Sequence, residues 1–99
     1  MKLIYAQEAV ADLARLRAFI ATHDPSSAQR IASDLVARIQ HLRSFPEMGR
    51  GVPQAPVRES VRDLFVGRYV VRYMVQGQAV MVLRVWHHHE SRVGDPRTA

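Results

Sequence analysis

The sequence contains no cysteine, and this absence excludes several classes of protein. Disulfide-stabilised folds, cysteine-bound zinc, iron–sulfur clusters and thiol nucleophiles all need at least one cysteine. Long apolar runs are missing as well. The longest, from Ala79 to Leu83, has five residues, whereas a membrane-spanning helix needs ~20. We therefore expect a fold held by its hydrophobic core, with no contact with a membrane.

The sequence predicts no secretory signal peptide. Glu8 and Asp12 interrupt the N-terminal segment, where a signal peptide would need a long apolar region. We expect a cytoplasmic protein. The 99 residues have a composition typical of an ordinary globular domain, and two separate cores would each be too small to fold readily. The sequence predicts one domain over residues 1–99.

Acidic residues are scarce: nine stand against 14 basic ones, which gives a net charge of +5. Lys2 is the only lysine, so nearly all of this positive charge is carried by arginine. Arginine has a rigid fork that binds carboxylates and phosphates through paired hydrogen bonds. The excess favours an acidic protein or a nucleic acid as partner, although a GC-rich genome would also enrich arginine.

Two amphipathic helices are predicted in the first half of the chain. Apolar residues recur at helical spacing from Gln7 to about His23, and again from Ala28 to Leu42. Asp24-Pro25 is typical of a helix start, and Pro46 prevents the second helix from continuing. Because the connection between them is short, the helices should pack antiparallel as a hairpin.

The second half of the chain predicts a small antiparallel sheet. The segment from Pro46 to Pro56 is rich in proline and glycine and is expected to be a loop. Beyond it, three segments rich in valine and tyrosine alternate in the manner of strands, at residues 61–66, 68–75 and 79–86. With residues 2–6 as an edge strand, the expected fold class is α+β: a helix hairpin packed on a twisted antiparallel sheet. The polar segment from Val93 onward is expected to be a frayed tail.

The turn around Gly77 decides which side chains share a face of this sheet. A two-residue turn, Gly77-Gln78, would place Arg72 on one face of the sheet and Arg84 on the other. A three-residue turn would place Arg72, Arg84 and Trp86 on one face, and we prefer this register because it gathers most of the large apolar groups under the helices. The bare face would then also carry Val70, Met74 and Val82. The core face would hold Tyr69, Val71, Tyr73, Met81, Leu83 and Val85.

No catalytic or cofactor motif is evident in the sequence. The run from His87 to Glu90 contains metal-ligand residue types, but alternation along a strand leaves only two of them on each face, so no metal site is expected. A phosphate-binding glycine loop and a nucleophile elbow are both missing from the sequence. We expect neither a cofactor nor a small-molecule substrate.

The remaining candidate site is basic and lies in the C-terminal half. One interpretation is a ribonuclease, in which arginines neutralise a phosphate and His87 serves as general acid or base; its set would be Arg72, Arg84, His87 and Arg92. The other is a docking surface for an acidic partner without chemistry. Its candidate residues are Arg50, Arg58, Arg62, Arg72, Arg84 and Trp86.

Several short matches, in order along nearly the whole chain, make the sequence resemble the RelE/ParE toxin family of type II toxin–antitoxin modules. They are Asp12-Leu13, Phe19-Ile20, Asp24-Pro25, Ala28, Leu42, Phe45-Pro46, Gly49-Arg50, Arg62, Gly67-x-Tyr69, Arg72-Tyr73, Leu83 to His87, and Arg92. The resemblance implies a small cytoplasmic growth inhibitor that acts in plasmid stabilisation and is neutralised by a cognate antitoxin, usually acidic. It further implies one of two targets: RelE-like members cut mRNA on the ribosome, whereas ParE-like members bind DNA gyrase.

Within this resemblance, two departures favour the ParE-like branch and therefore a toxin that is not an enzyme. Those ribonucleases commonly place an arginine three residues before the tyrosine of the middle strand, where this sequence has Val70 before Tyr73. They often add a tyrosine near the C-terminus, and none follows Tyr73 here. His87 and Arg92 resemble a C-terminal motif, H-x-x-x-x-R, that is found in both branches. The endoribonuclease therefore remains the alternative.

Overall fold

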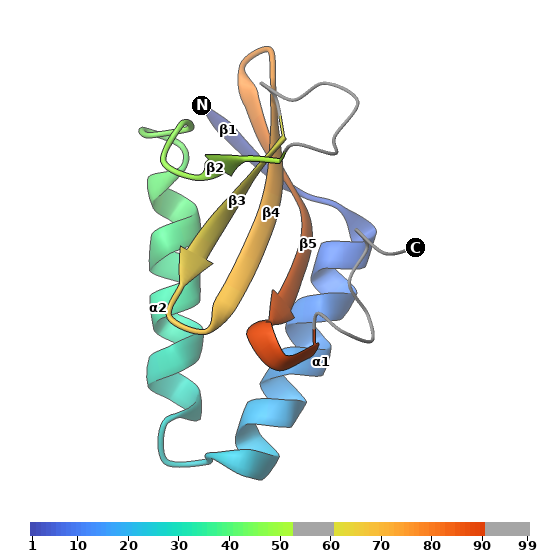
Figure 1. Ribbon diagram of the computed structural model, residues 1–99, viewed down its shortest axis with the longest axis vertical. Coiled ribbons are helices and arrows are strands. Elements are labelled where there is room, and N and C mark those ends of the chain that lie inside the picture. Colours follow the sequence, from blue (N-terminus) through green and yellow to red (C-terminus); the bar gives the residue numbers. More distant parts are fainter. Residues whose placement is uncertain (53–60, 91–99) are drawn as a thin grey trace.

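The computed structural model describes residues 1–52 and 61–90, so the expected site residues Arg58 and Arg92 and the tail from Val93 lie outside the described residues. Within these described residues, two helices, five strands and one short 3-10 turn follow one another (Figure 1). They are β1 (Lys2–Tyr5), α1 (Gln7–His23), α2 (Ala28–His41), β2 (Arg50–Gly51), β3 (Val61–Val66), β4 (Tyr69–Gln76), β5 (Ala79–His87) and the 3-10 turn His88–Glu90.

The α+β fold expected from the sequence is confirmed, with one difference in the sheet. All five strands form a single sheet in the order β1-β5-β4-β3-β2. The N-terminal strand joins this sheet, but it pairs parallel to β5, so the sheet is mixed rather than antiparallel throughout. A parallel neighbour needs a long crossover connection, and here the rest of the chain between β1 and β5 supplies it.

The helices cover one face of the sheet, here called the inner face, and the hydrophobic core lies between the two layers. Ala9, Leu16 and Ile20 of α1 pack there together with Leu35 and Ile39 of α2. This is the helical stripe expected from the sequence. None of the described helices is long and apolar enough to cross a membrane.

The start of α2 differs from the expected one. Asp24 does not cap the helix: its carboxylate accepts a hydrogen bond from the Ser26 hydroxyl, 3.2 Å away, and the helix begins only at Ala28. Backbone hydrogen bonds from Ser27 to Asp24 and from Ala28 to Pro25 close turns in this connection. The Asp-Pro pair therefore forms the turn that precedes the helix.

The register of the β4–β5 hairpin combines both of the registers considered above. Its turn has two residues, because Gln76 pairs with Ala79, so the preferred three-residue turn is wrong. Further along, Arg72 pairs with Arg84 and Tyr73 with Val82, which leaves Leu83 as an extra residue in β5. This β-bulge shifts the register by one residue. Arg72, Arg84 and Trp86 therefore share a face after all.

The bulge also changes which residues of β5 reach the core. Val80, Val82 and Val85 are fully buried in the core cluster, so Val82 does not lie on the face away from the helices. Met81 and Leu83, which were expected in the core, are only partly buried. The outer face, defined as the sheet face away from the helices, is less open than expected, because Val70 and Trp86 on it are buried.

A short clamp ties the loop after α2 to the sheet. The Tyr73 hydroxyl donates to the Pro46 carbonyl at 2.7 Å and accepts from the Gly49 amide at 2.8 Å. These contacts hold the chain in place just before β2, a two-residue strand within the segment that was expected to be loop. The rest of the loop, residues 53–60, lies outside the described residues.

Candidate functional site

Three of the predicted basic residues, Arg50, Arg72 and Arg84, belong to a row of charges across four strands of the outer face. Arg50 of β2 pairs with Asp63 of β3, Asp63 with Arg72 of β4, and Arg72 with Arg84 of β5. The expectation that Arg72 lies beside Arg84 is thus confirmed. A carboxylate within the row was not expected.

Arg72 is not a free cation. Its Nε and Nη2 donate to Oδ1 and Oδ2 of Asp63 at 2.8 and 3.0 Å, a paired arrangement between two buried side chains. The guanidinium carbon also lies 5.3 Å from the centre of the Trp86 ring, over its face. Because its charge is matched and its fork is occupied, Arg72 has little left with which to bind a phosphate.

Arg84 is matched by a carboxylate from the helix layer. Its Nε and Nη2 donate to Asp12 of α1 at 2.8 and 3.1 Å. Asp12 is only 5% exposed. Burial alone would raise the pKa of this carboxyl, but hydrogen bonds from Arg84, from the Val85 amide and from Arg15 outweigh it and hold the pKa below its usual value. Asp12 is therefore a fixed anion.

Asp12 and Arg15 together complete the open edge of β5. Strand β1 covers β5 only as far as Val82. Beyond that point, Asp12 accepts the Val85 amide at 2.9 Å and Arg15 donates to the Val85 carbonyl at 3.2 Å, as a neighbouring strand would. Arg15 also pairs with Glu90 of the 3-10 turn. Two side chains of α1 thus satisfy the backbone where the sheet has no further strand.

The other predicted docking residues differ in their surroundings. Arg62 donates to the Gly49 carbonyl at 2.9 Å, which holds its guanidinium against the loop. Arg50 is exposed, whereas Trp86 is only 3% exposed. Of the six residues predicted to dock a partner, the structure therefore places Arg50, Arg72, Arg84 and Trp86 on the outer face, with Arg62 beside the loop.

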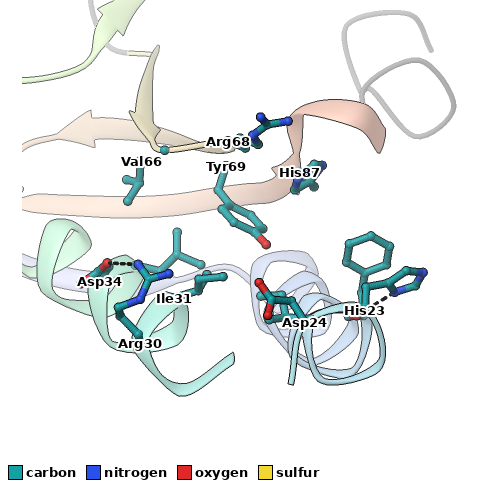
Figure 2. Close-up of a pocket in the computed structure, with 13 residues that line it drawn as sticks. His23, Asp24, Arg30, Ile31, Asp34, Val66, Arg68, Tyr69 and His87 are labelled. Carbon is teal, nitrogen blue, oxygen red and sulfur yellow. Dashed lines mark hydrogen bonds and ion pairs between the residues drawn. The ribbon is translucent and has the colours of Figure 1, made fainter. Parts of the chain in front are cut away.

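His87 lies on the other face of the sheet. It pairs with Tyr69, and the two side chains help to line a groove of about 370 Å³ between the strands and the ends of both helices. Figure 2 shows Tyr69 pointing from the strand toward the space between the helices, with His87 beside it. The candidate ribonuclease set is therefore divided: Arg72 and Arg84 are separated from His87 by the sheet itself.

The surroundings of His87 favour its neutral form. Its ring packs against Phe19, Tyr69 and His89 at centre-to-centre distances of 5.9, 5.0 and 5.2 Å. The His89 amide donates to its Nδ1 at 3.0 Å, so that nitrogen must be unprotonated. Burial lowers the pKa of His87, electrostatic interaction with His89 and Arg68 lowers it further, and Glu90 opposes them.

A pH dependence of stability follows from this shift. The unfolded chain protonates His87 near its ordinary pKa of 6.5 and the folded chain only at lower pH, so the unfolded state binds more protons between the two values. The contribution of His87 is complete above the ordinary pKa and is lost as the pH falls toward the folded one. We expect the free energy of unfolding, measured in urea from pH 7.5 to 5, to fall more steeply for wild type than for His87→Gln. Parallel curves would contradict this.

Two important groups were not predicted as site residues. In the sequence, Asp12 counted only against a secretory signal and toward the family resemblance, although its spacing from Ala9 and Leu16 puts it on the buried stripe; that spacing was the available signal. Asp63 becomes a partner of Arg72 only through strand pairing. Because register cannot be read from local pattern alone, no local signal identifies it.

Comparison with known proteins agrees with this fold. The sequence matches the family described as ParE toxin of type II toxin-antitoxin system, parDE, over residues 3–92. It is 35% identical to Toxin RelE2 of Caulobacter vibrioides over 86 residues, which cover 87% of this chain and 93% of that protein.

Several solved structures share the fold. One is of the chromosomal ParDE system from P. aeruginosa; it has a TM-score of 0.73 at 24% identity, and the match covers 88% of this chain and 95% of the other. Another is the RelB-RelE antitoxin-toxin complex from Methanococcus jannaschii, with a TM-score of 0.54 at 18% identity and coverages of 90% and 94%. This chain belongs to the RelE/ParE toxin family. Its family model describes a toxin of a type II toxin–antitoxin system.

Proposed function

We propose that this toxin arrests growth by binding DNA gyrase and not by cutting RNA. The observation that carries the proposal is the separation of His87 from Arg72 and Arg84 on opposite faces of the sheet. A nuclease needs its proton-transfer group within reach of the phosphate that its cations neutralise. Both arginines are instead engaged by Asp63 and Asp12.

We further propose that the antitoxin is acidic, acts in the cytoplasm and contacts the basic outer face. Arg50 is the exposed cation at one end of the charge row, and Arg84, at the other end, keeps 37% of its side chain exposed. The buried side chains of Arg72 and Trp86 would hold this surface in place. Arg62 and Arg58 are the remaining residues that we propose to contact the antitoxin. An acidic segment gains both attraction and orientation from such a surface.

A ribosome-dependent mRNA endonuclease is the second candidate. It is favoured by the name of the Caulobacter relative, Toxin RelE2. In this mechanism Arg72, Arg84, His87 and Arg92 would form the catalytic site that cleaves the mRNA. A conformational change on the ribosome would have to move His87 close to the two arginines of the outer face.

The test compares wild type with His87→Gln in two assays. We expect wild-type protein to inhibit supercoiling by purified gyrase, and His87→Gln to inhibit it within about twofold, because His87 is not part of the proposed mechanism. Thermal melting would verify that the variant is folded. If the wild-type protein leaves gyrase active and cuts mRNA on ribosomes, and if His87→Gln loses this cleavage, the gyrase proposal is wrong and the endonuclease function is correct.

A further inference from the structure

A second groove, at the opposite end of the molecule from His87, exposes an unusual amount of apolar surface. It has a volume of about 720 Å³, and its apolar walls are Met1, Phe45, Pro46, Met48 and Val75. The exposed fractions of Phe45, Met48 and Met1 are 63%, 38% and 37%. These are three of the six large hydrophobic residues that are exposed in the described part of the chain. We call this the Phe45 groove.

The Phe45 groove is held rigidly. The Phe45 amide donates to the His41 carbonyl at the end of α2, and the Met48 amide donates to the Phe45 carbonyl, at 2.9 and 3.1 Å. Tyr73 holds Pro46 from below at 2.7 Å. On the other wall, the Met1 ammonium donates to the Arg43 carbonyl and Arg43 Nε donates to the Met1 carbonyl, both at 3.1 Å. An exposed phenyl ring on such a support loses little freedom when it binds a partner.

Positive charge surrounds the Phe45 groove. Arg62 lines it and Arg43 contacts Met1, while Lys2 follows Met1 in the chain. Arg38 and Arg50 share the neighbouring hollow with Met48. Within residues 1–52 and 61–90, no ion pair joins any of these five side chains to a carboxylate. Among the residues that the structure describes, Glu47 is the one acidic residue that lines the groove.

We infer that the Phe45 groove docks the protein that this toxin inhibits, through an acidic segment with apolar anchor side chains. The inference rests on the proposed function and names the surface that would carry it. Charge complementarity selects an acidic partner, and the methionine, proline and valine walls suit aliphatic or aromatic side chains. A second copy of the chain is disfavoured, because a symmetric contact would bring two groups of uncompensated cations together.

Nucleic acid is a poorer occupant of the same groove. Bases are bound by stacking on several aromatic rings along a line of cations, whereas the described lining of this groove contains one phenyl ring and one arginine, Arg62. Apolar anchors surrounded by charge are the usual arrangement of a protein interface.

The test is Phe45→Glu, which removes the anchor and adds repulsion toward an acidic segment. Val10→Glu is the matched control, because Val10 is 55% exposed on α1 and does not line the groove. With purified gyrase, we expect Phe45→Glu to need at least about 30-fold more toxin for half-inhibition of supercoiling, and Val10→Glu no more than about threefold more. Circular dichroism and melting would show that both variants fold.

Each other outcome has a defined meaning. If Phe45→Glu inhibits gyrase as well as Val10→Glu does, the inference is wrong while the proposed function stands. If wild type leaves gyrase active yet arrests growth, the gyrase proposal fails; the inference then stands only if Phe45→Glu alone relieves the arrest. If a labelled single-stranded RNA binds wild type but not Phe45→Glu, the occupant is nucleic acid and the inference fails. If wild type affects neither gyrase nor growth, both proposals fail.

Discussion

Replacing Asp12 with alanine is expected to lower the free energy of unfolding by about 3 kcal/mol. The change removes the acceptor for the buried Val85 amide and leaves Arg84 and Arg15 without their shared carboxylate. Both arginines are partly exposed, so they regain water, and the expected loss stays at the lower end for a broken buried pair. Urea denaturation with far-ultraviolet circular dichroism measures it.

Two further variants separate the contributions of Asp12. Asp12→Asn keeps an oxygen for the Val85 amide and removes the charge, so we expect roughly half of the loss. Asp34→Ala removes a carboxylate from an exposed pair, 3.8 Å from Arg30, and should change stability by less than about 0.5 kcal/mol. If Asp12→Ala were as mild as Asp34→Ala, the carboxylate would not hold the β5 edge in solution.

The second large effect is expected at Gly49, where alanine should destabilise the fold by about 2–3 kcal/mol. A Cβ built there would lie 2.8 Å from the Asp63 carbonyl oxygen and 2.8 Å from two atoms of the Tyr73 ring and hydroxyl. Neither neighbour can move freely, because one is strand backbone and the other is a fully buried side chain. Thermal and urea denaturation would measure the loss.

Gly67→Ala is the control for Gly49→Ala. Gly67 has a φ of +58°, which disfavours alanine, but apart from its two neighbours in the chain no residue has an atom within 4 Å of the added Cβ. Its cost should be backbone strain alone, about 1 kcal/mol. Equal losses at the two glycines would mean that Tyr73 and the strand yield, and that the clamp between Pro46, Gly49 and Tyr73 is looser than its hydrogen bonds indicate.

Local patterns predicted the elements of this fold well because each pattern has one dominant physical cause. Helical spacing placed α1 at the bounds that it has, Gln7–His23, and alternation placed β3 at Val61–Val66. The start of α2 was predicted less well, since Asp24-Pro25 is compatible with a turn as well as with a helix cap. The same ambiguity applies to any short polar connection.

Non-local pairing limited the prediction of the site. The two-residue turn and the extra residue Leu83 have opposite effects on the register, so a wrong turn still placed Arg72 beside Arg84. The partners that neutralise these arginines come from α1 and β3. Helical spacing could indicate that Asp12 is buried, but it does not identify Arg84, 72 residues away, as its partner. The sequence therefore predicted free cations where the fold contains ion pairs.

The parallel pairing of β1 with β5 has a consequence for how the toxin is made. Strand β1 pairs only with β5, near the C-terminal end of the described residues. The carboxylate of Asp12 likewise has its backbone partner, the Val85 amide, in β5. During synthesis β1 therefore has no neighbouring strand until β5 has left the ribosome, since distant contacts form only once both partners have been made. An incomplete nascent chain should lack the finished surface and be harmless to its own cell.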